Sequence, residues 1–85
     1  MRLTVEIEKV AKGETPGTVE FYFDKEGLDT LLRRIELIRT GKTDHVHLFT
    51  PLWGTDDDDL SEEKLLKKND LAHHLKLTMI DSSEE

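Results

Sequence analysis

The stretch that decides the fold is His45-Val46-His47-Leu48-Phe49-Thr50-Pro51-Leu52-Trp53-Gly54. Side chains alternate across a β-strand, so Val46 and Leu48 share one face while His45, His47 and Phe49 share the other. Pro51 cannot donate a ladder hydrogen bond, which predicts that the strand ends near Thr50. Leu52 and Trp53 then leave the sheet on a turn that closes with Gly54.

The chain before this stretch alternates in the same way at 3–10 and 18–24, separated by a Gly- and Pro-containing loop at 11–17. This pattern predicts two antiparallel strands joined by a hairpin loop. The side chains that we expect to point inward are Leu3, Val5, Ile7, Val19, Phe21 and Phe23.

At Asp24 the apolar period changes from two to 3.6, which predicts a helix with Asp24 as its N-cap. Gly41 is a typical C′ residue for its end, and Leu37 lies off the apolar stripe. The expected stripe consists of Leu28, Leu31, Leu32, Ile35 and Ile38.

Beyond the acidic loop, residues 60–69 have the composition of a short lysine-ended helical turn, and 71–80 alternate as a last strand. Four strands and one long helix require an α+β, two-layer sandwich of ββαββ type, with the helix on one face of a mostly antiparallel sheet. Residues 1–80 are expected to form this single domain, and 81–85 a frayed acidic tail. The open face should carry Glu6, Glu8, Glu20, Tyr22, His45, His47, His74, Lys76 and Thr78.

The 85-residue chain has 19 acidic and 12 basic side chains, and its formal net charge is −7. This charge disfavours nucleic acid and anionic membranes as partners and favours a basic protein. Cysteine is absent, which excludes a disulfide framework, a thiolate metal site and a cysteine nucleophile. No secretory signal or membrane-spanning stretch is evident, so we expect a cytoplasmic protein.

Histidines raise the question of a metal site. His45, His47 and His74 are expected on one face, whereas His73 points away from His74, so at most three imidazoles meet. A closed Zn²⁺ site requires about four ligands. The alternatives are a divalent-metal site and ordinary polar residues on a solvated sheet surface, and we assign no metal and no cofactor.

The acidic run Asp56, Asp57, Asp58 and Asp59 lacks the alternate ligand spacing and the closing Glu of an EF-hand. It is either a solvated loop or an electrostatic landing site for a basic partner. Trp53 beside it is either a lid over the open end of the core or an interface anchor.

Three arrangements would indicate catalysis: a nucleophile with a base, paired carboxylates in an apolar cleft, and a glycine-rich phosphate loop. None is present in a persuasive arrangement, since Ser61 lies in the acidic segment and Ser82 and Ser83 lie in the tail. The sequence therefore predicts a binding protein rather than an enzyme.

The segment from His45 to Thr50, followed by Trp53-Gly54 and Leu60-Ser61, resembles the immunity protein 32 family. The similarity extends to the opening strands and to Gly27-Leu28. Where the family has a further small residue after Trp-Gly, this chain has Thr55 and four Asp. The resemblance implies a cytoplasmic bacterial inhibitor that binds a cognate toxin domain and performs no chemistry.

We therefore expect a non-enzymatic module that neutralises a basic toxin domain. The residues expected to contact it are His45, His47, Trp53, Asp56, Asp57, Asp58, Asp59 and His74. Two alternatives remain open: a homodimer that pairs edge strands or stacks open sheet faces, and the histidine metal site.

Overall fold

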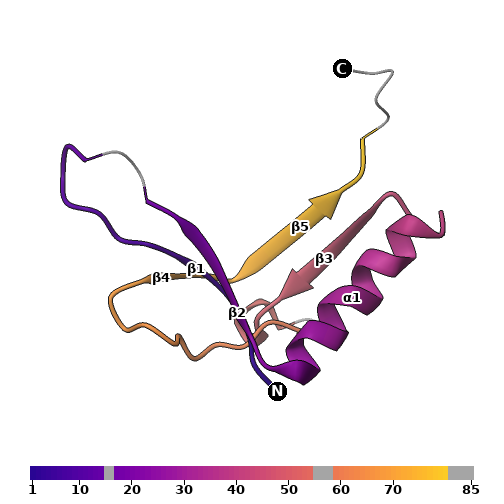
Figure 1. The fold of residues 1–85 in the computed structure, drawn as a ribbon, viewed down its shortest axis with the longest axis horizontal. Coiled ribbons are helices and arrows are strands. Elements are labelled where there is room, and N and C mark those ends of the chain that lie inside the picture. The colour runs from indigo at the N-terminus through magenta and orange to yellow at the C-terminus, as the bar shows by residue number, and fades with distance from the viewer. Residues whose placement is uncertain (15–16, 55–58, 81–85) are drawn as a thin grey trace.

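The computed structural model describes residues 1–14, 17–54 and 59–80. Its elements are β1 (Leu3–Ile7), β2 (Val19–Phe23), α1 (Lys25–Arg39), β3 (His45–Phe49), the 3₁₀ turn η1 (Pro51–Trp53), β4 (Asp70–Ala72) and β5 (His74–Thr78). The strands form two antiparallel sheets, β2-β1-β4 and β3-β5, and α1 packs most extensively along β3 (Figure 1). The predicted α+β class, with antiparallel strands and one packed helix, is confirmed, but the strands divide between two sheets.

The hairpin of β1 and β2 pairs in the predicted antiparallel sense, with Leu3 opposite Phe23 and Ile7 opposite Val19. On its other edge, β1 pairs with β4. Leu3 and Val5 on one face of β1 are buried in the core, and so are Thr4 and Glu6 on the other face. The central strand of this sheet is therefore covered on both sides.

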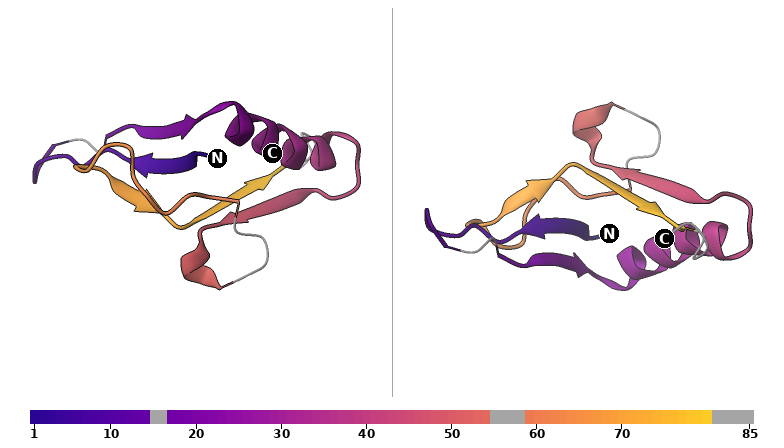
Figure 2. Two further views of the ribbon diagram at one scale, coloured as in Figure 1. Left: turned by 90° about the horizontal axis from the view of Figure 1, so that it is seen from below. Right: turned by 90° about the horizontal axis from the view of Figure 1, so that it is seen from above.

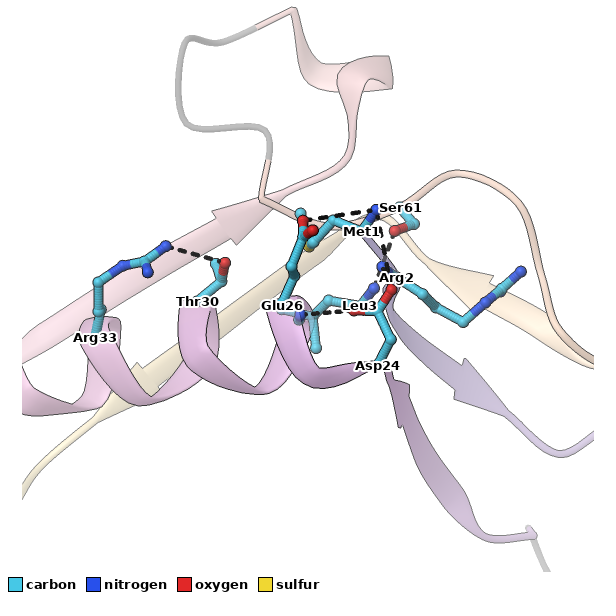
Figure 3. A network of polar contacts seen from close by, with 9 residues as sticks. Met1, Arg2, Leu3, Asp24, Glu26, Thr30, Arg33 and Ser61 are labelled. Carbon is cyan, nitrogen blue, oxygen red and sulfur yellow. Dashed lines mark hydrogen bonds and ion pairs between the residues drawn. The ribbon is translucent and has the colours of Figure 1, made fainter.

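Asp24 caps α1 as predicted, because its Oδ1 accepts the N–H of Gly27 at 2.8 Å. Its Oδ2 accepts the N–H of Arg2 at 2.9 Å, so one carboxylate joins the helix start to β1 (Figure 3). These two hydrogen bonds, that from Gly27 foremost, hold the pKa of Asp24 below its usual range. At the other end, Gly41 follows the C-cap residue Thr40 with φ +81°, which confirms the predicted helix end.

The face of α1 that packs against the sheets differs from the predicted stripe. Leu31 and Ile38 contact the core as expected, and Leu37, placed off the stripe, also packs against it. Leu32 and Ile35 are exposed. Relative to the predicted stripe, the helix is rotated about its axis so that Gly27 and Thr30 are buried at its start. Gly27 lies so close to the backbone of Arg2 that a Cβ would overlap it.

Residues 60–69 do not form the predicted helical turn. Their backbone N–H groups bond to other elements instead: Leu60 to the carbonyl of Phe49, Ser61 to that of Leu3, and Leu65 and Leu66 to the carboxylate of Glu6. Leu60 is buried, whereas Leu65 and Leu66 are exposed. The segment is an irregular cover over the polar face of β1.

The last strand is divided at His73. β4 pairs with β1, whereas β5 pairs with β3, so the chain crosses from one sheet to the other between Ala72 and His74. The carbonyl of His73 accepts the N–H of Thr50 at 2.9 Å. Alternation across 71–80 did not reveal this division, because both halves keep the same period.

The prediction of a single open polar face is also wrong. Glu6, predicted on that face, is fully buried. On β2, by contrast, the three side chains predicted to point inward are exposed although they share a face with core residues: Val19, Phe21 and Phe23. Figure 1 shows why, since α1 leaves the end of β2 along the other sheet and does not cover β2.

No helix in the described ranges is long and apolar enough to cross a membrane. Asp56, Asp57, Asp58 and the predicted tail at 81–85 lie outside the described residues.

Candidate protein-binding surface

Five rings gather on the face of the β3-β5 sheet that points away from α1. Val46 and Leu48 occupy the helix side and are buried, so the alternate residues of β3 face outward as predicted. We call this group the ring cluster; it consists of His45, His47, Phe49, Trp53 and His74.

The centre of the ring cluster is a stack of three rings. Phe49 lies directly opposite His74 in the register, with ring centroids 4.5 Å apart and an interplanar angle of 14°. His47 stacks on His74 at 5.0 Å and lies nearly parallel to Phe49. His45 meets His47 edge-on and completes the row along β3. Stacking of this kind holds the side chains in fixed positions, which reduces the entropy lost when a partner binds.

Trp53 reaches the ring cluster through the turn after β3. Pro51 begins η1, and Gly54 ends it with φ +64°, a left-handed conformation that favours glycine. The indole lies 5.4 Å from Phe49 and 5.3 Å from His74, and the residue is 54% exposed. Figure 2 shows η1 projecting on the opposite side of β3 from the helix. The lid interpretation of Trp53 is therefore wrong.

All four histidines have a polar partner within the chain. His47 Nδ1 lies 2.8 Å from His74 Nε2, so one ring donates and the other accepts. His45 Nδ1 lies 2.7 Å from Asp44 Oδ1, and His73 Nδ1 lies 2.7 Å from the hydroxyl of buried Thr50. Among the described residues, no group of three or more His, Asp or Glu side chains is arranged to hold a metal ion.

Burial lowers the pKa of His47, and the neighbouring charges of His74, His45 and Lys76 lower it further. A neutral imidazole is consistent with the contact to His74, which requires one ring nitrogen without a proton. The carboxyl of Asp44 has a lowered pKa because it hydrogen-bonds His45. The lowered pKa favours a neutral His47 within the stack, and the Asp44 carboxylate lies at the end of the row beside His45.

Of the acidic run, only Asp59 is described. Its Oδ2 lies 3.2 Å from Arg34 Nε, so this carboxylate forms an ion pair with the helix. Arg34 also donates to the carbonyl of His47 at 2.9 Å, which connects the end of the acidic run to the strand below the ring cluster. Partner binding by Asp59 remains a prediction.

Phe49 lies on the face predicted for it and is central to the stack, although it was not among the residues predicted to bind a partner. The signal was present, because Phe49 alternates with Val46 and Leu48 in the same register as the histidines.

No pocket is found in the part of the chain that the structure describes. The chain matches no protein-family model, no curated protein and no solved structure in the comparisons made.

Proposed function

We propose that this chain is a non-enzymatic binding protein, and specifically a cytoplasmic immunity protein that neutralises a basic toxin domain. The observation that supports this proposal most is the exposure of the ring cluster, with Trp53 at its rim. Interfaces obtain most of their binding free energy from a few aromatic residues with rigid, largely apolar bodies. A 54% exposed Trp53 packed against both Phe49 and His74 has these properties.

Charge supports a basic partner. The net charge of −7 would accelerate encounter with a cationic surface, such as the substrate groove of a nuclease, and would repel nucleic acid. The chain would inhibit by covering that groove, with no bond made or broken. A standard interface buries about 800 Å² on each partner, and the ring cluster would supply the centre of such an interface.

The test is co-expression with the C-terminal domain of the protein encoded beside this chain. We expect the chain to restore growth of cells that produce that domain, and the purified pair to associate more weakly as salt rises, because exposed charges are screened. Failure to restore growth, together with the absence of binding by the purified proteins, would reject the proposal.

A matched pair of variants locates the interface. Trp53→Ala should weaken binding by at least about 2 kcal/mol, as hot-spot truncations do, with little change in melting temperature. Leu52→Ala is the control, because Leu52 is more exposed than Trp53 and makes no ring contact with the cluster. Equal effects of the two variants would place the interface elsewhere.

A further inference from the structure

The second surface of interest is the outer side of β2. Val19, Phe21 and Phe23 are 57%, 38% and 46% exposed, and Ile7 beside them on β1 is 42% exposed. In the described residues, thirteen large hydrophobic side chains are exposed and six hydrophobic ones are buried. An apolar face of this kind on an acidic, highly charged chain indicates that another surface covers it.

The backbone of β2 is also open on one side. β2 lies at the end of its sheet, with β1 as its one neighbour within the described ranges. Glu8 N–H bonds to the carbonyl of Thr18, and Asp24 N–H bonds to that of Arg2. Hydrogen-bonded pairs recur at every second residue, so Glu20 and Tyr22 bond to β1 while Val19, Phe21 and Phe23 direct their N–H and C=O groups outward.

We propose that a second copy of this chain binds here, with the two β2 strands antiparallel about a twofold axis through Phe21. Phe21 then lies opposite Phe21 of the second copy, and Val19 lies opposite Phe23 of the second copy. Each of these pairs is of the hydrogen-bonded type and exchanges two bonds, giving about six new backbone hydrogen bonds. The two three-stranded sheets become one six-stranded sheet.

Self-complementarity on both faces identifies a second copy as the occupant. The apolar face matches Phe with Phe and Val with Phe, which are favourable cross-strand pairs. On the polar face the same register places Glu20 opposite Tyr22 of the second copy. These two groups are chemically matched, because the Tyr22 hydroxyl already donates to Glu20 Oε2 at 2.7 Å within one chain. A twofold interface requires such self-matching, whereas a different partner does not.

β2 also lacks several of the usual protections of an edge strand. It contains no proline, no lysine and no bulge in its register with β1. Edge strands without these features pair readily with other chains. The proposed surface lies on a different sheet from the ring cluster, so a dimer leaves Trp53 and the histidines accessible, and the proposal stands independently of the proposed function.

The first test is the mass in solution as a function of concentration, by light scattering. We expect it to rise from the mass of one chain, 9.8 kDa, to twice that value. Phe21→Glu, which places two carboxylates together at the axis, should raise the dimer dissociation constant at least about tenfold. Leu52→Glu, which alters a more exposed leucine outside β2, should leave it unchanged. A mass of one chain at every concentration, or a dimer unaffected by Phe21→Glu, would overturn the proposal.

The second test determines the register of the two β2 strands and uses more than one variant. Val19→Lys and Phe23→Glu should each weaken the dimer, whereas the double variant should dimerise more strongly than either single variant, because the axis sets position 19 against position 23 of the second copy. Within one chain these positions are about 13 Å apart along the strand, so they cannot pair directly. A double variant that does not dimerise more strongly than both single variants would refute this register. Circular dichroism confirms that each variant is folded.

Discussion

The two sheets leave opposite kinds of face accessible, although β1 itself is covered on both sides. In the β3-β5 sheet, α1 covers the aliphatic face and the imidazoles and aromatic rings stay accessible. In the β2-β1-β4 sheet, residues 60–69 cover the polar face, and much of the apolar face remains accessible. The same alternating pattern therefore produces two kinds of surface, one polar and aromatic and one aliphatic and aromatic.

The difference arises from Glu6. Its carboxylate accepts hydrogen bonds from the N–H groups of Leu65 and Leu66, from the Thr4 hydroxyl and from the amide of Asn69, at 2.7–3.2 Å. A buried carboxylate is tolerated only when its oxygens are satisfied in this way. His47, at the corresponding outward position of β3, is half-buried and has no covering segment like 60–69 among the described residues.

The largest effect is expected for Glu6→Gln. The amide nitrogen that replaces one oxygen would face donors on either side, which should lower the free energy of unfolding by about 3 kcal/mol. His47→Gln, the matched change on the open face of the other sheet, should lower it by less than about 0.5 kcal/mol. Urea denaturation measures both. Similar losses in the two variants would show that the two polar faces are covered alike.

The dependence of stability on acid pH provides a second test of Glu6. Burial alone would raise the pKa of Glu6, but its hydrogen bonds, led by that from Leu65, outweigh burial and lower the pKa from 4.5 to about 2. A carboxyl with a lowered pKa stabilises the fold fully above its ordinary value and loses this contribution as pH falls from about 4.5 to about 2. Glu6→Gln should flatten this part of the stability profile. An unchanged slope would assign the acid sensitivity to other carboxyls.

Gly27→Ala is expected to have the next largest effect. Alanine is normally more favourable than glycine in a helix interior. At this position, however, its Cβ would overlap the carbonyl oxygen of Arg2. Because that atom belongs to the backbone of the residue just before β1 and cannot rotate away as a side chain could, we expect a loss of about 2 kcal/mol in the free energy of unfolding. Lys25→Ala, in the same first turn and exposed, is the control. A stabilised Gly27→Ala variant would show that the helix start can move away from the β2-β1-β4 sheet.

Local chemistry predicted three of the element ends correctly. Asp24 caps the helix, Gly41 ends it, and Pro51 ends β3, because each residue acts on its own backbone or its nearest neighbours. Alternation likewise brought His45, His47 and His74 to one face, and Trp53 joined them through the turn.

Local sequence patterns could not predict which faces of the two sheets are covered by other parts of the chain. Whether Phe21 or Glu6 is buried depends on where α1 and residues 60–69 lie, and those positions are set by contacts distant in sequence, such as Glu6 with Leu65 and Ser61 with Leu3. The division of the last strand at His73 has the same cause, since each half is assigned by its partner strand. Periodicity identifies residues that share a face but carries no information about what covers it.

The smallest effect is expected for mild acid on the β3-β5 sheet. The pKa of His47 is lowered by burial and by His74, His45 and Lys76, so the unfolded chain binds a proton more readily than the folded chain. Stability from this group is complete above its ordinary pKa of 6.5 and declines as pH falls below it. Calorimetry from about pH 7.5 to 5.5 should show a small fall in melting temperature for the wild-type chain and a smaller one for His47→Gln.

Protonation of His47, whose Nδ1 lies 2.8 Å from His74 Nε2, also adds positive charge to the ring cluster. Binding of a basic partner through this face should therefore weaken over the same pH interval, whereas pairing through β2, which contains no histidine, should not. Measuring both associations at the two pH values distinguishes the sheets by function. If both respond equally, the two surfaces are not independent and the contrast between the sheets does not extend to binding.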